Sequence, residues 1–222
     1  MKKFTNLDVV ATLIWLLPFA YLYKVYPSLP AKVPLHFNIN GKPDRYGSTH
    51  ELLMSLLLLT VVGVATAFLV RFLPKIDPKK MAKYSAGTFQ KMFVGMSFLF
   101  VAIEIMIITS ASHRFDFEKI LLPLLGIFFA FLGNMMYSLK PNYFAGVRTP
   151  WTLESEDTWR ATHQLAGKIW FVGGMLITII TLFLPATLAH TVFISLTIIM
   201  ALWPTVYSYL HFKKHKPNAV NE

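Results

Sequence analysis

Six long apolar runs constrain this 222-residue chain more than any other feature of its sequence. About 20 mostly apolar residues are enough for a helix to cross the roughly 30 Å hydrocarbon core of a bilayer. The runs have this length, and they lack the alternation of polar and apolar residues that marks transmembrane β-strands. We therefore predict an all-α, polytopic membrane protein with about six transmembrane helices in one bundle. The runs are Leu7–Tyr26, Leu52–Leu73, Phe89–Ser110, Ile120–Leu139, Lys168–Leu184 and Thr191–Leu210.

Composition supports this class and removes several chemistries. Only 14% of the residues are charged, against about a quarter in soluble domains. The chain contains no Cys, which excludes a disulfide framework, a zinc-thiolate site, an iron–sulfur cluster and a cysteine nucleophile. The basic start Met1-Lys2-Lys3 resembles that of a signal peptide, but no small-x-small cleavage site follows the long first run. We interpret this run as a retained anchor.

Basic residues divide unevenly between the two sides of the predicted bundle. With a cytoplasmic N-terminus, fifteen Lys and Arg residues fall inside and six outside, as the positive-inside rule expects. The net charge of +10 is then a topology signal rather than a sign of nucleic-acid binding, and it suits anionic lipid at the cytoplasmic leaflet. We predict that both termini are cytoplasmic and that nucleic acid is not a direct partner. The six outside residues are Lys24, Lys32, Lys42, Arg45, Arg114 and Lys119.

The predicted outer loop, residues 27–48, is dense in turn-forming residues. Four prolines exclude a helix through it, Asn40-Gly41 favours a turn, and Val33–Ile39 is expected to be extended. Ser48 and Glu51 match a capping box at the start of the second span. The polar side chains form either a ligand site or a set of groups that satisfy the loop backbone, and their spacing fits no metal template. The candidate residues are Pro34, His36, Phe37, Asn38, Gly41 and Asp44, with His50 nearby.

The predicted inner loop, residues 141–168, contains a second helix start. Thr152 is a plausible N-cap, because acidic residues follow in the first turns, where they suit the helix dipole. Glu156 and Arg160 have the spacing of a favourable i,i+4 pair. We predict a short amphipathic cytoplasmic helix that leads into the fifth span, with Trp151 and Trp159 as anchors at the membrane interface.

Two functions are open for this inner loop: a docking surface or switch, and a simple elbow that positions a helix. Trp159 and His163 share one helix face with Gly167. Arg148, Thr149 and His163 could contact a phosphate or transfer a proton. However, the sequence shows neither a glycine-rich phosphate loop nor a Ser/His/Asp arrangement, so we do not predict an enzyme or a cofactor.

Polar residues inside the spans are the remaining candidates. Glu104 lies deep in the third run, where an ionisable group is costly and therefore a functional candidate by default. Its alternative role is a protonated carboxyl bound to a neighbouring backbone. Asn134 is expected to hydrogen-bond between helices. Gly126, Gly133 and Gly173-Gly174 are expected to let helices approach closely. His211 and His215 are i,i+4 neighbours in a basic tail, where solvation is expected rather than a metal.

Both loops resemble known motifs. The outer pattern, from Leu29-Pro30 through His36-Phe37-Asn38 to Asp44, resembles the extracytoplasmic motif of the membrane domain DUF1648. The inner pattern is similar to the signature of the SdpI family, and Thr49-His50 stands where relatives of the outer motif often carry a Lys. We assign residues 1–73 to a DUF1648-like region and 74–222 to an SdpI-like region of one membrane domain. The inner signature comprises Asn142, Phe144, Gly146, Val147, Arg148, Thr149, Pro150, Trp151, Thr152, Leu153, Trp159, Thr162 and His163.

The resemblance implies a function. SdpI-type proteins are bacterial multi-span membrane proteins, whose founding member protects its producer against a secreted killing peptide and draws a small transcriptional repressor to the membrane. It therefore implies a bacterial plasma-membrane protein that gives immunity to a peptide toxin, recruits a repressor, or does both. The alternative is a small transporter or channel that uses Glu104 and Asn134. The ligand, the partner and the oligomeric state stay open.

Overall fold

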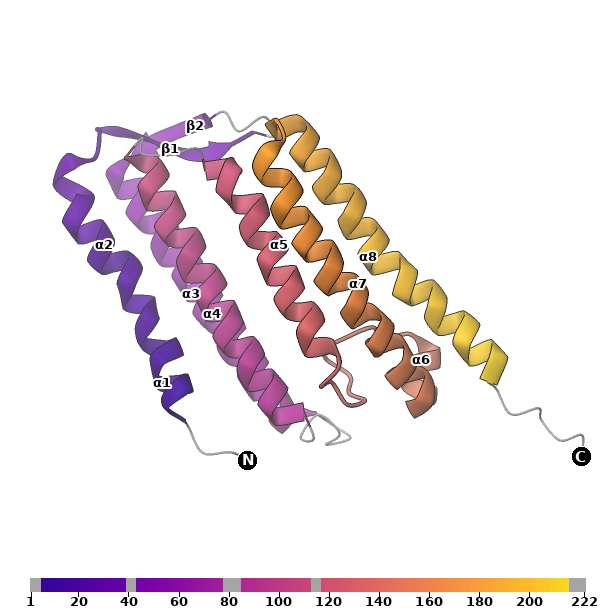
Figure 1. The fold of residues 1–222 in the computed structure, drawn as a ribbon. Helices are drawn as coiled ribbons and strands as arrows, with labels where there is room; N and C mark the ends of the chain where they lie inside the picture. The colour runs from indigo at the N-terminus through magenta and orange to yellow at the C-terminus, as the bar shows by residue number, and fades with distance from the viewer. Residues whose placement is uncertain (1–4, 39–42, 78–84, 113–116, 216–222) are drawn as a thin grey trace, which may run out of the picture.

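The computed structural model describes residues 5–38, 43–77, 85–112 and 117–215. Six helical segments in this part of the chain are long and apolar enough to cross a membrane. They stand side by side, with a small sheet at one end and the short helix α6 (Pro150–Glu154) at the other (Figure 1). The predicted polytopic helical bundle is confirmed. We call the sheet end the outer end and the α6 end the inner end, following the predicted orientation.

The first span is not one regular helix. It consists of α1 (Asn6–Leu13), the 3₁₀ turn η1 (Ile14–Leu16), α2 (Leu17–Val25) and the 3₁₀ turn η2 (Tyr26–Ser28). Pro18 lies in the first turn of α2, and proline has no N–H to donate to the preceding turn. The other spans are α3 (Thr49–Ile76), α4 (Ala86–Ala111), α5 (Phe117–Met136), α7 (Glu156–Phe183) and α8 (Ala186–His215).

The outer loop folds into a two-stranded antiparallel sheet of β1 (Lys32–Phe37) and β2 (Pro43–Ser48). The extended segment predicted over Val33–Ile39 is present as β1 as far as Phe37, and Asn38 follows the strand. Ile39 and the predicted Asn40-Gly41 turn lie outside the described residues. Ser48 then caps α3, because its hydroxyl accepts from Glu51 N and its own N–H donates to Glu51 Oε2. The predicted capping box is confirmed.

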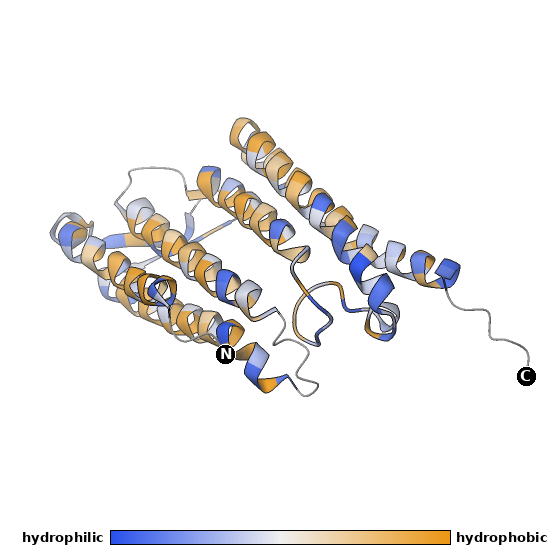
Figure 2. Ribbon diagram, turned by 60° about the horizontal axis from the view of Figure 1, so that its bottom comes forward, coloured by the Kyte–Doolittle hydropathy of each residue, from blue (hydrophilic) through white to orange (hydrophobic). Residues whose placement is uncertain are grey.

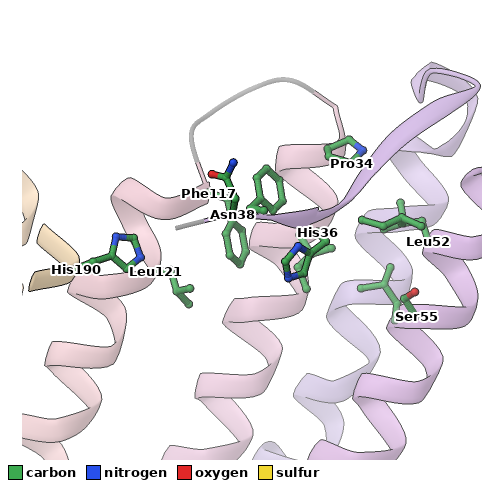
Figure 3. Close-up of a pocket in the computed structure, with 12 residues that line it drawn as sticks. Pro34, His36, Asn38, Leu52, Ser55, Phe117, Leu121 and His190 are labelled. Carbon is green, nitrogen blue, oxygen red and sulfur yellow. The ribbon is translucent and has the colours of Figure 1, made fainter. Parts of the chain in front are cut away.

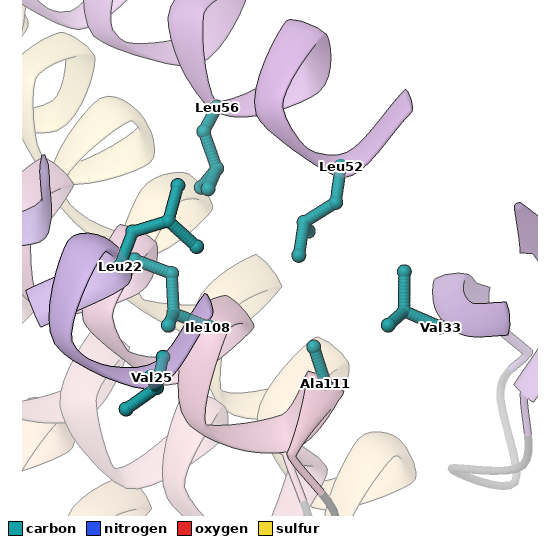
Figure 4. Close-up of a cluster of buried hydrophobic side chains, with 7 residues drawn as sticks. All are labelled: Leu22, Val25, Val33, Leu52, Leu56, Ile108 and Ala111. Carbon is teal, nitrogen blue, oxygen red and sulfur yellow. The ribbon is translucent and has the colours of Figure 1, made fainter. Parts of the chain in front are cut away.

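The helices form two groups. In the first group, α3 packs on α4, and α1 and α2 also contact α4. Its outer apolar cluster includes Leu22, Leu56 and Ile108, and buried Val33 joins the sheet to it (Figure 4). In the second group, α7 packs on both α5 and α8. The main helix contact across the two groups is between α4 and α5, and we call it the seam.

Small residues bring α5 and α7 close together. A Cβ on Gly133 would lie 2.4 Å from Phe171 N, and one on Gly174 would lie 2.4 Å from Ala130 N. A Cβ on Gly126 would lie 2.7 Å from Gly174 O. The predicted close approach is confirmed, and it follows the rule that small residues line helix contacts in membranes. The outward faces of the helices are largely apolar, with hydrophilic residues gathered near the helix ends (Figure 2), as a lipid-facing surface requires.

Candidate functional site

The outer site is a cavity of about 360 Å³ between β1 and the helices below it. Its walls come from both helix groups, since α3 and α4 face α5 and α8 across it (Figure 3). The floor is apolar, and His36, Asn38, Ser55 and His190 add polar groups. The apolar lining residues are Pro34, Leu35, Phe37, Leu52, Leu56, Ile107, Phe117 and Leu121. We call this the outer cavity.

Two histidines of the outer cavity are oriented through Nδ1. His36 Nδ1 lies 2.6 Å from Asp44 Oδ1, which ties β1 to β2. His190 Nδ1 lies 2.8 Å from Ala186 O, an acceptor in the first turn of α8. Each ring therefore donates through Nδ1 and leaves Nε2 as the atom that can meet a ligand. The structure thus brings His36, Phe37, Asn38 and Pro34 to one cavity, with Asp44 behind His36. The candidate residue Gly41 lies outside the described residues.

The inner site is built around His163 on α7. Its Nε2 accepts from Val147 N at 3.1 Å, and its Nδ1 lies 2.8 Å from Trp159 O, so the proton is on Nδ1. The ring stacks on Trp159 with centroids 4.0 Å apart. Gly146 has φ +101°, and a Cβ there would lie 2.1 Å from His163 Nε2. Both ring nitrogens hold backbone groups, so His163 braces the loop rather than standing ready for proton transfer.

Asn142 makes the turn that precedes Gly146. Its Oδ1 accepts from Phe144 N and Ala145 N, both at 2.8 Å, and its Nδ2 donates to Lys140 O and Ala145 O. Asn142 is 2% exposed, so a side chain with four hydrogen bonds replaces regular backbone pairing here. The exposed Arg148 adds a bond from its guanidinium to Tyr143 O.

The N-cap of helix α6 is Thr149, not the predicted Thr152. The Thr149 hydroxyl accepts from Thr152 N, and Pro150 occupies the first helical position, where its missing N–H costs nothing. Thr149 also meets Ser208 Oγ of α8 at 3.0 Å. Ser155 then caps α7 through Thr158 N. The predicted amphipathic helix is therefore divided: α6 is a single short turn, and the remainder is continuous with the fifth span.

Two further predictions for the inner loop are wrong. Trp159 is 1% exposed and donates from Nε1 to Leu139 O at 2.8 Å, so it ties α7 to the end of α5 instead of anchoring at the interface. Arg160 pairs with Asp157 at 2.8 Å, one turn away, rather than with Glu156.

Trp151 packs on Tyr209 of α8. Thr162 is fully buried beside Trp159 and His163 on the same face of α7.

An inner cavity of about 320 Å³ lies beneath this loop. Phe144, Ala145, Gly146 and Val147 form one wall of it. The other walls come from α3, α4, α5 and α7, and their side chains are apolar apart from the indole N–H of Trp170, which donates to Met200 O. These residues are Val70, Leu73, Phe89, Met92, Leu132, Met136, Leu139 and Trp170.

The intramembrane polar candidates differ from each other. Glu104 is fully buried, and its Oε1 lies 2.7 Å from the Thr60 hydroxyl of α3. Its Oε2 has no hydrogen-bond partner in the part of the chain that the structure describes. Asn134, in contrast, is exposed on α5, so the expectation that it packs between helices is wrong. The helix turns it outward because Gly133 and Met136 occupy the face toward the neighbouring helices.

Sequence reasoning missed a buried ionic cluster at the inner end. Asp8 is fully buried and accepts from Arg71 Nε at 2.8 Å and from Gln90 Nε2 at 2.9 Å. Thr5 N adds a bond of 2.8 Å to the same carboxylate. The signal was present, because Asp8 and Arg71 are opposite charges inside two predicted spans, and such groups usually pair. The cluster joins α1, α3 and α4.

The described residues contain no group of three or more His, Asp or Glu side chains that could hold a metal ion. The outer cavity and the inner loop lie at opposite ends of the bundle. Together, the fold and these sites define a polytopic helical membrane protein with a small sheet at one end of the bundle and the loop of residues 141–149 at the other.

Comparison with known proteins shows which families the chain resembles. Residues 138–208 match the SdpI/YfhL protein family, and residues 13–64 match the domain of unknown function DUF1648. The chain is thus similar to SdpI-family proteins in its C-terminal part and to DUF1648 in its N-terminal part. It is 25% identical over 216 residues to the immunity protein SdpI of Bacillus subtilis strain 168, covering 96% of this chain and 98% of that protein. It is also 39% identical over 70 residues to an uncharacterized protein of Archaeoglobus fulgidus, covering 31% of this chain and 34% of that protein. No solved structure matches it.

Proposed function

We propose that this chain is an immunity protein that protects a cell against a secreted antimicrobial peptide. The observation that carries the proposal is the outer cavity, an apolar space with His36, Asn38 and His190 among its lining. A site of this composition suits an amphipathic ligand, because apolar walls supply contact area and a few polar groups set orientation. The end-to-end match to a protein named for immunity supports the same function.

We further propose that the inner loop recruits a cytoplasmic partner, a small transcriptional repressor. Arg148, Pro150, Leu153 and Arg160 are exposed on a surface whose backbone is held in place by Asn142 and His163. A rigid loop with exposed basic and apolar side chains loses little conformational entropy on binding. The buried residues of the signature are then the support of this surface rather than its contact points.

Protection is tested in Bacillus subtilis cells from which SdpI has been removed, grown beside wild-type producer cells. We expect expression of this chain to raise survival above that of cells with an empty vector. A chimera in which residues 27–48 are replaced by the corresponding segment of the Bacillus subtilis protein serves as the positive control for folding and insertion. Survival of the chimera together with death of cells expressing this chain would show that its outer site does not recognise that peptide.

A transporter is the second candidate function, and buried Glu104 favours it. A carboxyl within a membrane span commonly marks an ion or proton pathway. If it does so here, Glu104→Gln should abolish proton flux in reconstituted vesicles while the protein still folds, since Gln preserves the contact with Thr60. Thr60→Val, which removes that contact and leaves the carboxyl, is the matched control. Equal flux in wild-type and Glu104→Gln vesicles would reject the transporter.

A further inference from the structure

The seam has cavities at both ends and a closed point between them. At the closed point, a Cβ on Gly95 of α4 would lie 2.4 Å from Phe131 Cε1 of α5. The ring of Phe131 thus rests directly on the backbone of α4, with no side chain between them. We call this contact the waist.

Above the waist, the outer cavity separates the two groups. Leu52, Leu56 and Ile107 line it from the first group, and Leu121 and His190 line it from the second. Strand β1 reaches across the seam here, since its Phe37 stacks on Phe117 of α5 with centroids 5.3 Å apart. An occupant of this cavity therefore touches both groups at once.

Below the waist, the groups meet through polar contacts and the inner cavity. Ser85 Oγ accepts from Lys140 N at 2.8 Å, and Thr88 Oγ1 donates to Ser138 O at 3.3 Å. Residues 144–147 of the inner loop form one wall of the inner cavity, which lies between α4 and α5. A change in the α4–α5 separation at this end must therefore move or reshape that wall.

We propose that the outer cavity receives an apolar side chain of an extracytoplasmic peptide, and that this side chain rocks the two helix groups about the waist and displaces the inner loop. The ligand class rests on the proposed function, whereas the coupling rests on the seam alone. Separation at the outer end brings the inner ends of α4 and α5 together, which compresses the inner cavity and pushes residues 144–147 outward. Packed interfaces respond in this way because they switch between discrete arrangements instead of deforming smoothly.

The occupant fits the cavity by size and polarity. A space of about 360 Å³ is within the range of small-ligand pockets, roughly 300–1,000 Å³. The apolar floor suits a Leu or aromatic side chain, and the Nε2 atoms of His36 and His190 are available for the peptide backbone. To shift the bundle, the peptide must bind the rocked arrangement better than the resting one.

The coupling can be tested without any peptide, because the chain has no Cys and one reporter can be introduced. Ala145→Cys places a thiol in the wall of the inner cavity. Leu121→Trp then supplies a large apolar side chain inside the outer cavity, as a covalent substitute for that of the peptide. The matched control is Ile127→Trp on the same helix, because Ile127 is 55% exposed and lies on the surface of the bundle rather than in the cavity. The measurement is the rate of maleimide reaction at residue 145 in reconstituted protein.

We expect Leu121→Trp to raise this rate about fivefold or more, the lower end of typical coupling between sites, and Ile127→Trp to leave it unchanged. Adding Phe131→Ala, which removes the waist, should cancel the increase. Ser55→Phe fills the same cavity from α3 and should reproduce the effect if Leu121→Trp does not fold. Unchanged rates in both cavity-filling variants, Leu121→Trp and Ser55→Phe, when both are folded would overturn the coupling. That result would leave the proposed immunity function untouched.

Discussion

Asp8→Ala should be among the most damaging single substitutions in this protein. It leaves the guanidinium of Arg71, a residue only 8% exposed, without its carboxylate. It also removes one of the two acceptors of Gln90 Nε2, the other being Thr5 Oγ1. Breaking a buried ion pair in this way typically costs about 3–5 kcal/mol, because the remaining charge is unpaired. We expect the loss to appear as a lower unfolding midpoint in detergent, measured by far-ultraviolet circular dichroism.

A double substitution separates the cost of the unpaired charge from the value of the pair. Asp8→Leu with Arg71→Met removes both charges and keeps apolar volume at the same place. Such replacements are often neutral or stabilising, so this variant should recover most of the lost stability. If Asp8→Ala is as stable as the wild type, the cluster does not hold α1 against α3 and α4.

Gly146→Ala should disorder the inner loop while the spans stay folded. Gly146 has φ +101°, and the new Cβ would lie 2.1 Å from His163 Nε2. A non-glycine residue in such a conformation costs about 1–3 kcal/mol, and losing the Val147–His163 hydrogen bond adds about 0.5–1.5 kcal/mol. Because the Val147–His163 bond ties this part of the loop to α7, we expect faster proteolysis within residues 142–149 and lost capture of the repressor.

The matched control for Gly146→Ala is Gly87→Ala. A Cβ on Gly87, in the first turn of α4, meets no atom within 4 Å. It should leave the proteolysis pattern unchanged, since the same chemical change is made at a position with free space. Wild-type resistance of Gly146→Ala to protease would contradict the bracing role of His163.

Some of the site could be read from the residues themselves. The capping box at Ser48 and Glu51 depends on atoms three residues apart, so its spacing alone predicted it. The shared face of Trp159 and His163 follows from helix periodicity, and their rings do stack. The burial of Glu104 followed from its place inside an apolar run.

Other parts of the site depended on partners far along the chain. Trp159 was expected at the membrane interface, yet it is buried and its indole N–H donates to Leu139 O. Thr60, the partner of Glu104, lies 44 residues away on α3. Asn134 turned outward because close packing of α5 on α7 uses the glycine face of the helix. Periodicity gives the faces of one helix, but not which face meets which neighbour.

The sequence by itself determined the six spans, the Ser48–Glu51 cap of α3 and the family signatures, because these depend on run length and on residues a few positions apart. Only the tertiary structure decided that Asp8 meets Arg71, that Gly95 and Phe131 close the seam, and that a cavity lies on each side of them. Lipid tails are as apolar as the helix surfaces, so apolar content does not select helix partners in a membrane. Close packing and polar contacts select them, and these exist only once the helices are placed in space.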